Sequence, residues 1–161
     1  MRIIFILLFL ANLVLTMIMS FLLPAYTPID LSGGMISGGS SADLGTLIYI
    51  FMEVLMFGII YFAPRLMFSL PPRWYNLPNT DYWLREENKP RALSIISSMM
   101  WQFGAVVFLF LLVVHVLSIT AHLSGPVPAD ETKFVLVFVL FLLFVIVWCI
   151  KFFRAFQVPR A

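Results

Sequence analysis

Two ionisable side chains lie within otherwise apolar stretches of the sequence, and their chemistry needs an explanation. Glu53 lies near the middle of the stretch 44–62, and His115 lies in the stretch 97–121. A carboxylate near the centre of a bilayer costs about 2.5–3.5 kcal/mol on insertion scales, so it is expected to face protein or water. Counting residues along both stretches places Glu53 and His115 at a similar depth. We therefore predict a buried Glu53–His115 pair, which could hold a proton or pass one.

Further polar side chains recur at helical spacing in the first two apolar stretches. Residues three or four apart lie on one face of a helix, so each set predicts a face turned toward the interior of a helix bundle. Such residues can form an interhelical hydrogen-bond clamp, a proton or ion relay, or a polar contact with a partner subunit. The predicted buried polar residues are Asn12, Thr16 and Ser20 in the first stretch and Thr46, Tyr49 and Glu53 in the second.

Cofactor and metal chemistry have little support in the sequence. His115, Ser118 and His122 share a helical face and could in principle present haem or metal ligands. A haem in a bundle normally takes its axial ligands from two facing helices, so ligation by these histidines would require a second chain. The single cysteine, Cys149, excludes an internal disulfide and a Cys-rich metal site. We expect no cofactor, no metal and, because no hydrolase or nucleotide-binding motif is present, no enzyme activity.

The elements that carry these residues are predicted to be membrane-spanning helices. Of the 161 residues, 62% are hydrophobic and only 11% are charged, and the mean hydropathy is +1.03. This composition is typical of a chain in lipid, and the length leaves room for four crossings with short connections. We predict an all-α polytopic four-helix bundle forming one domain, with spans at about 3–23, 44–62, 97–121 and 134–153. Asp43 is expected to cap the second span, and Ala63 and Pro64 to mark a break or a kink at its end.

The distribution of basic residues predicts the orientation of the bundle. Nine of the ten Lys and Arg residues lie at the N-terminus, between the second and third spans, or at the C-terminus, and Lys133 is the tenth. Because cytoplasmic loops retain Lys and Arg, both termini are expected on the cytoplasmic side of a bacterial inner membrane. The first span is expected to be retained rather than cleaved. The Gly- and Ser-rich loop Pro24–Asp43 is expected to be flexible, and the net charge of +2 does not favour nucleic-acid binding.

The connection 64–96 has the composition of a segment that lies in the membrane interface. It combines prolines, mixed charge and aromatic side chains with polar edges, which favour the headgroup layer. Asn79 is predicted to cap a short surface helix. The alternative is that the segment is a binding epitope for a partner. The candidate interfacial or partner-binding residues are Trp74, Tyr75, Asn79, Tyr82 and Trp83.

Three short motifs in residues 70–91 resemble those of a known family. They are Leu70-Pro71-Pro72-Arg73, Asn76-Leu77-Pro78-Asn79, and Tyr82-Trp83-Leu84 followed by Glu86 or Glu87. The sequence is similar here to an uncharacterised family of small bacterial membrane proteins, related to the N-terminal region of the SdpI immunity protein. The resemblance implies a four-helix layout and immunity to a membrane-active peptide. Family members usually carry a histidine after the first helix, whereas Pro24–Asp43 contains none.

These observations predict a non-enzymatic integral membrane protein, an accessory or structural subunit that packs against other membrane proteins. Its expected partners are the lipid bilayer and other transmembrane subunits, or further copies of the same chain. One alternative is a proton-linked or small-solute transporter that uses Glu53 and His115. The other, suggested by the family resemblance, is immunity to a membrane-active peptide.

Overall fold

Every element in the described part of the computed structural model is a helix. The description covers residues 1–22, 39–67, 69, 77–123 and 131–158. The prediction of an all-α chain with four long apolar helices is confirmed for these residues. The elements are α1 (Arg2–Leu22), α2 (Gly39–Met67), α3 (Thr80–Trp83), α4 (Lys89–Leu123) and α5 (Glu131–Ala155).

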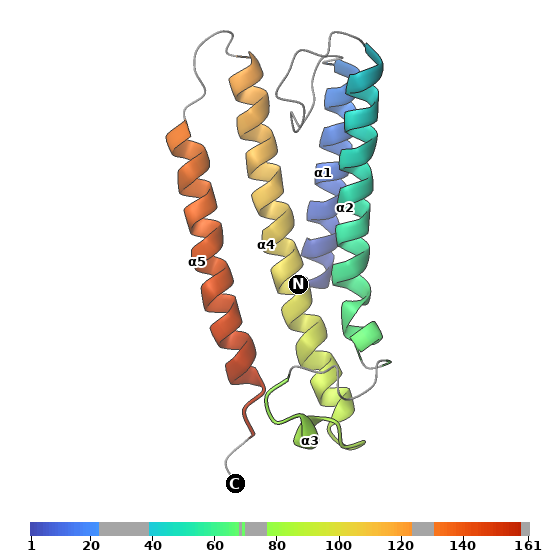
Figure 1. Ribbon diagram of the computed structural model, residues 1–161, viewed down its shortest axis with the longest axis vertical. Coiled ribbons are helices and arrows are strands. Elements are labelled where there is room, and N and C mark those ends of the chain that lie inside the picture. The colour runs from blue at the N-terminus through green and yellow to red at the C-terminus, as the bar shows by residue number, and fades with distance from the viewer. Residues whose placement is uncertain (23–38, 68, 70–76, 124–130, 159–161) are drawn as a thin grey trace.

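The long helices are arranged around α4 (Figure 1). α4 packs against α1, α2 and α5, and α1 also packs against α2. α5 lies along the side of α4 that faces away from α1 and α2, so α4 is its one extensive neighbour among the described elements. The core is therefore a three-helix unit of α1, α2 and α4, with α5 attached to its flank.

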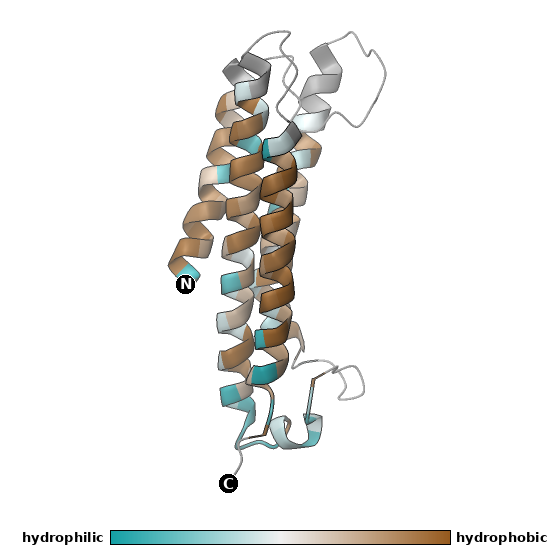
Figure 2. Cartoon of the chain, turned by 90° about the vertical axis from the view of Figure 1, so that its left-hand side faces the viewer, coloured by the Kyte–Doolittle hydropathy of each residue, from teal (hydrophilic) through white to brown (hydrophobic). Residues whose placement is uncertain are grey.

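Each long helix contains a stretch apolar enough to cross a membrane. These stretches are Arg2–Ser20, Gly45–Met67, Lys89–Thr120 and Thr132–Ala155, so the chain is a multi-pass membrane protein by length and composition. Hydrophobic residues colour most of each long helix in Figure 2, and polar residues gather at the lower end. Helices suit this environment because they satisfy their backbone hydrogen bonds internally.

Two helices extend further than the apolar stretches alone predicted. α2 begins at Gly39, so Asp43 lies inside the helix rather than capping it, and it continues through Pro64 to Met67. Pro64 is tolerated because it falls in the last turns, where few hydrogen bonds depend on its missing N–H. α4 begins at Lys89, eight residues before the expected start. Pro90 is compatible with this start because it falls in the first turn, where a backbone N–H has no helical partner.

A layer of phenylalanines joins α1, α2 and α4. The Phe57 ring stacks on those of Phe5 and Phe9, with centroids 4.9 and 4.3 Å apart, and the Phe108 ring lies 5.7 and 5.4 Å from the same two rings. Gly104 lets α4 approach this layer closely: a Cβ built there would lie 2.5 Å from a ring carbon of Phe5. These rings form a compact apolar layer across the three-helix unit.

The segment around α3 folds back against the lower end of α4 and the residue that follows α5. Trp83 and Phe156 are both fully buried, and their rings meet edge to face at 5.3 Å. The Trp83 indole N–H donates to the Phe156 carbonyl oxygen at 2.9 Å. Leu77, Ala92 and Ile96 complete this second apolar cluster. The α3 segment therefore fastens the C-terminal residues to the lower end of α4.

Candidate functional site

A cluster of polar side chains is buried inside the three-helix unit, above the phenylalanine layer. Glu53 is 2% exposed and His115 is 3% exposed, although both lie in apolar helices. Tyr49 is half-buried beside them, whereas Ser20 is partly exposed and donates to the carbonyl of Met17 in its own helix at 2.9 Å. The buried polar residues are Asn12 and Thr16 from α1, Thr46 and Glu53 from α2, and His115 from α4.

Asn12 joins α1 to α4 through its amide group. Its Nδ2 donates to the carbonyl oxygen of Leu8 at 2.8 Å and to that of Phe108 at 2.9 Å. Both amide protons are thus engaged, which fixes the orientation of the side chain. Its Oδ1 is buried and accepts no hydrogen bond from the described residues. Asn12 therefore acts as an interhelical clamp that leaves one acceptor pointing into the core.

Glu53 and His115 are both buried in the core, but no regular hydrogen bond joins them. Neither Glu53 oxygen accepts a regular hydrogen bond from the described residues, so none comes from His115. The Tyr49 hydroxyl approaches the carboxylate as a donor from the previous turn without reaching full hydrogen-bond geometry. His115 instead meets the Tyr49 ring edge to face, with centroids 5.8 Å apart. Tyr49 lies one helical turn before Glu53 on α2, and a Glu53–His115 pair stays a prediction.

The contacts between α1 and α2 define the depth of Glu53. Phe57 of α2 stacks on Phe5 and Phe9 of α1, and these helices run in opposite directions. Glu53 is one turn above Phe57, about 6 Å along the axis, and so lies level with the turn above Phe9, which contains Asn12. Helical side chains lean toward their own N-terminus, so Glu53 leans upward while Asn12 and Thr16 lean downward. The three side chains are therefore expected to lean toward the same level of the core.

The candidate haem ligands His115 and His122 lie on the same helix. Both residues belong to α4, and the side chain of His122 lies outside the described residues. Within the described part of the chain, no three His, Cys, Asp or Glu side chains come together. Glu53 and His115 are the ionisable side chains that are buried among the described residues.

The interfacial residues separate into different environments. Trp74 and Tyr75 lie outside the described residues, while Tyr82 is half-buried. The expectation that Trp83 faces the headgroups or a partner is wrong, because it is 1% exposed and packed within its own chain. Asn79 is at the N-cap of α3, but its side chain caps no helix; its Nδ2 donates to the Phe156 carbonyl at 3.1 Å. Asn79 also has a positive φ of 57°, a conformation that Asn tolerates better than most residues.

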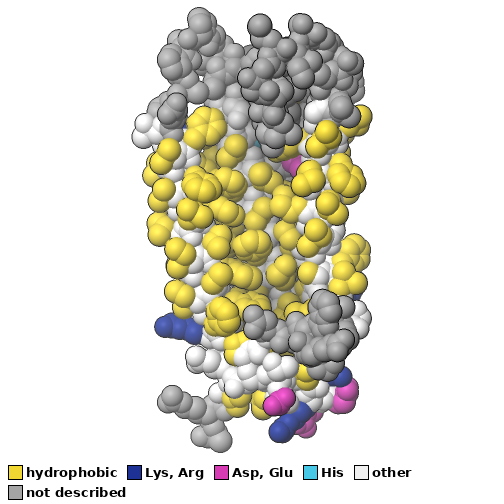
Figure 3. All heavy atoms as spheres, viewed as in Figure 1, with side chains coloured by type: hydrophobic (Ala, Val, Ile, Leu, Met, Phe, Trp, Pro, Cys, Tyr) yellow, Lys and Arg dark blue, Asp and Glu magenta, His cyan; other side chains and the backbone are white. Residues whose placement is uncertain are grey.

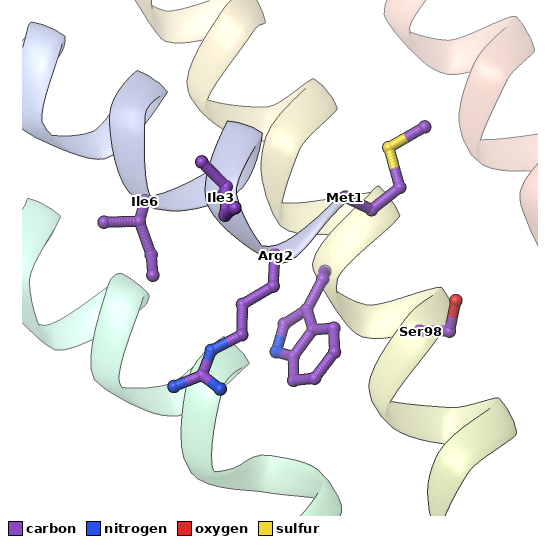
Figure 4. Close-up of a pocket in the computed structure, with 6 residues that line it drawn as sticks. Met1, Arg2, Ile3, Ile6 and Ser98 are labelled. Atoms are coloured by element: carbon purple, nitrogen blue, oxygen red, sulfur yellow. The ribbon is translucent and has the colours of Figure 1, made fainter.

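Arg2 forms a second polar feature, which the sequence did not predict, at the lower end of α1. Its guanidinium donates to the Tyr61 hydroxyl and lies over the Tyr61 and Trp101 rings, at 5.3 and 5.7 Å from their centroids. Figure 4 shows Arg2 pointing from α1 toward α2 at the edge of a surface hollow that Ser98 also lines. The cation–π contacts tie the start of α1 to α2 and α4.

Comparison with protein-family models, with curated proteins and with solved structures finds no match for the chain. The resemblance of residues 70–91 to the family related to the SdpI immunity protein therefore stays a prediction. Within the described residues, part of that motif has a structural role: Asn79 and Trp83 both donate to the carbonyl of Phe156. Leu70, Pro71, Pro72, Arg73 and Asn76 lie outside the described residues.

Proposed function

We propose that this protein is a non-enzymatic accessory subunit of a larger membrane assembly, and that α5 with the adjoining face of α4 binds another transmembrane protein. The observation that carries the proposal is the position of α5. No residue in the most apolar stretch of α5 is buried, whereas α1, α2 and α4 each bury part of their most apolar stretch. α5 is held along one side only, so most of its surface is open to a neighbouring helix.

A groove between α4 and α5 supports the same proposal. Its lining is entirely aliphatic and aromatic, and its volume is about 240 Å³. Lipid tails cover an apolar surface as well as a helix does, so transmembrane helices associate through close packing rather than through hydrophobicity. A groove gives a second helix the shape complementarity that such packing needs. The lining residues are Val106, Leu109, Phe110, Val113, Val137, Leu140, Phe141 and Phe144.

Site-specific photo-crosslinking in native membranes tests this role. A photoreactive side chain at Leu140, which is 57% exposed in the groove, is expected to give one discrete adduct that mass spectrometry identifies as another membrane protein. The matched control is Phe51 on α2, which is 64% exposed and does not line the α4–α5 groove. Equal yields of the same adducts from both positions, or no adduct from Leu140, would count against the accessory role. An adduct between two copies of the chain would show that the partner is a second copy of this protein.

We also propose that both termini face the cytoplasm across a bacterial inner membrane. The basic residues near the lower end of the bundle support this orientation, since Lys and Arg favour the cytoplasmic side (Figure 3). In a Cys149→Ser background, Thr132→Cys should react with an impermeant thiol reagent on intact cells, and Gln157→Cys only after permeabilisation. The reverse pattern would invert the orientation.

Proton- or solute-linked transport is the second candidate function, and the buried carboxylate of Glu53 is the observation that favours it. A transporter that carries a proton or a cation on Glu53 loses that carrier in Glu53→Gln. Proton flux into vesicles that contain purified protein is expected to fall to the background of empty vesicles in this variant. Glu86→Gln, at an exposed residue, is the matched control and should keep the flux. Equal proton flux in the two variants would exclude transport that depends on Glu53.

A further inference from the structure

We propose that the surface hollow at the start of α1 binds the headgroup of one anionic phospholipid. The hollow has a volume of about 650 Å³ and lies between the first residues of the chain and the lower half of α4. Its lining consists of Met1, of Arg2, Ile3 and Ile6 from α1, and of Ser98 and Trp101 from α4. The inference is independent of the accessory role, because none of these residues lines the α4–α5 groove.

The hollow lies where the apolar surface of the bundle gives way to basic residues, toward the lower end in Figure 3. Arg2 donates to the hydroxyl of Tyr61 on α2, and on the other side of α4 Trp148 donates at 3.1 Å to the carbonyl one residue above Ser98. The basic residues that follow these two rings within about one turn are Arg65 on α2 and Lys151 on α5. Amphipathic aromatic rings followed by Lys and Arg are typical of the headgroup layer. The hollow is therefore expected at the depth of the lipid phosphates.

The shape of the molecule leaves room for a lipid at this depth. α1 begins well above the lower end of α4 (Figures 1 and 2). Arg2 lies over the Trp101 ring, whereas α4 begins at Lys89, so α4 continues for about 18 Å below that contact. Ile3, which lines the hollow, is 72% exposed, and Leu7, one turn further along α1, is 58% exposed. A phosphate beside Arg2 would thus leave the acyl chains to run upward along the apolar outside of α1.

The charge in the hollow favours a ligand with a net negative charge. The Arg2 guanidinium has five N–H donors, and its one hydrogen bond with the described residues goes to the neutral Tyr61 hydroxyl. Arginine binds phosphate oxygens through two parallel hydrogen bonds. No described carboxylate lines the hollow, so the ammonium of a zwitterionic headgroup would find no ion-pair partner there. Basic pockets between transmembrane helices bind anionic headgroups for this reason.

Two neutral groups in the lining can also donate to a phosphate. The Trp101 indole N–H is buried and has no acceptor within the described residues. The Ser98 hydroxyl likewise forms no hydrogen bond with them, whereas Ser118 of the same helix donates to the Val114 carbonyl at 2.9 Å. The lining therefore offers unused donors next to a cation, and phosphate oxygens are acceptors.

Thermal unfolding of the purified protein in a neutral detergent tests the site. Its Tm is compared in micelles that contain equal amounts of dioleoyl phosphatidylglycerol or dioleoyl phosphatidylcholine. At a phosphatidylglycerol concentration tenfold above its dissociation constant, ligand linkage predicts a Tm about 3–6 °C higher than in phosphatidylcholine. This difference should disappear in Arg2→Gln and in Ser98→Leu, which fills the hollow and keeps Arg2. It should persist in the matched control Arg65→Gln, which removes an exposed arginine that does not line the hollow.

Three results would overturn the proposal. Equal Tm values in the two lipids would exclude selection of an anionic headgroup. A difference that survives in both Arg2→Gln and Ser98→Leu, or one that Arg65→Gln abolishes as fully as Arg2→Gln does, would place the lipid effect outside the hollow. A rise with inorganic phosphate alone that equals the rise with phosphatidylglycerol would assign the hollow to free phosphate. Ser98→Leu keeps the test decisive if Arg2→Gln does not fold, because it leaves the Arg2 contacts in place.

Discussion

Gly104 is the residue at which a single added methyl group should test the packing of the three-helix unit. A Cβ at this position would lie 2.5 and 2.7 Å from two ring carbons of Phe5 and 2.8 Å from a methyl carbon of Ile60. Phe5 is fully buried and stacked on Phe57, so its ring cannot move aside without disturbing that stack. Overpacking a core in this way typically costs about 1–3 kcal/mol.

Gly58→Ala is the matched control for Gly104→Ala. A Cβ at Gly58 meets nothing within 4 Å, and both glycines lie inside long helices. Alanine gains about 1 kcal/mol of helix propensity over glycine at either position. Because this gain is common to the two variants, the difference in their free energies of unfolding isolates the overpacking, about 1–3 kcal/mol against Gly104→Ala. The measurement is reversible unfolding in mixed micelles of increasing sodium dodecyl sulfate, followed by circular dichroism.

A double-mutant cycle identifies the atoms responsible. Phe5→Leu alone should destabilise the protein, because it removes a stacked aromatic ring from the core. The same substitution in the Gly104→Ala background should cost less, because it also relieves the clash, and the coupling energy should exceed about 0.5 kcal/mol. If Gly104→Ala proves as stable as Gly58→Ala, or if the cycle shows no coupling, α4 does not approach α1 as closely as described here.

Three further substitutions test contacts outside that crossing. Trp83→Phe keeps most of the buried ring but removes the N–H donor to the Phe156 carbonyl, so it should cost about 0.5–1.5 kcal/mol and increase proteolysis of the C-terminal residues. Asn12→Leu removes the clamp between α1 and α4 and should destabilise the bundle by about 0.6–1.7 kcal/mol in the same micellar unfolding assay. Lys89→Gln removes an exposed ion pair with Glu86 and should leave the unfolding midpoint unchanged.

The sequence predicted the long helices well and the short segments poorly. Apolar runs of membrane-spanning length leave few alternatives to a helix, so all four were found. The second span was ended too early because Pro64 indicates a break in the sequence, whereas it lies within the last turns of α2. The third was started eight residues too late, since α4 begins at Lys89. The burial of Trp83 was not predictable from its neighbours in sequence. It depends on Phe156, which lies 73 residues away and follows a different helix.

The candidate site was predictable in its residues but not in its pairing. The cost of a carboxylate in lipid indicates that Glu53 faces inward, and helical spacing places Asn12 and Thr16 on one face. Which polar group lies beside Glu53 depends on the relative height of the helices. The stacking of Phe57 between the rings of α1 sets that height, and composition does not encode it.

α4 contacts both the buried polar cluster and α5, so it is the element that connects the cluster to the α4–α5 groove. Its Phe108 carbonyl accepts the Asn12 clamp on the side of the polar cluster, whereas Phe110 stacks on Phe141 of α5, with ring centroids 4.5 Å apart. Residues 108 and 110 are two positions apart and therefore point to different sides of one helix. A partner bound in the α4–α5 groove would touch no residue of the polar cluster directly. Any effect of such a partner on Glu53 would require α4 itself to shift or rotate, and the Asn12 hydrogen bond and the close contact at Gly104 both resist that motion.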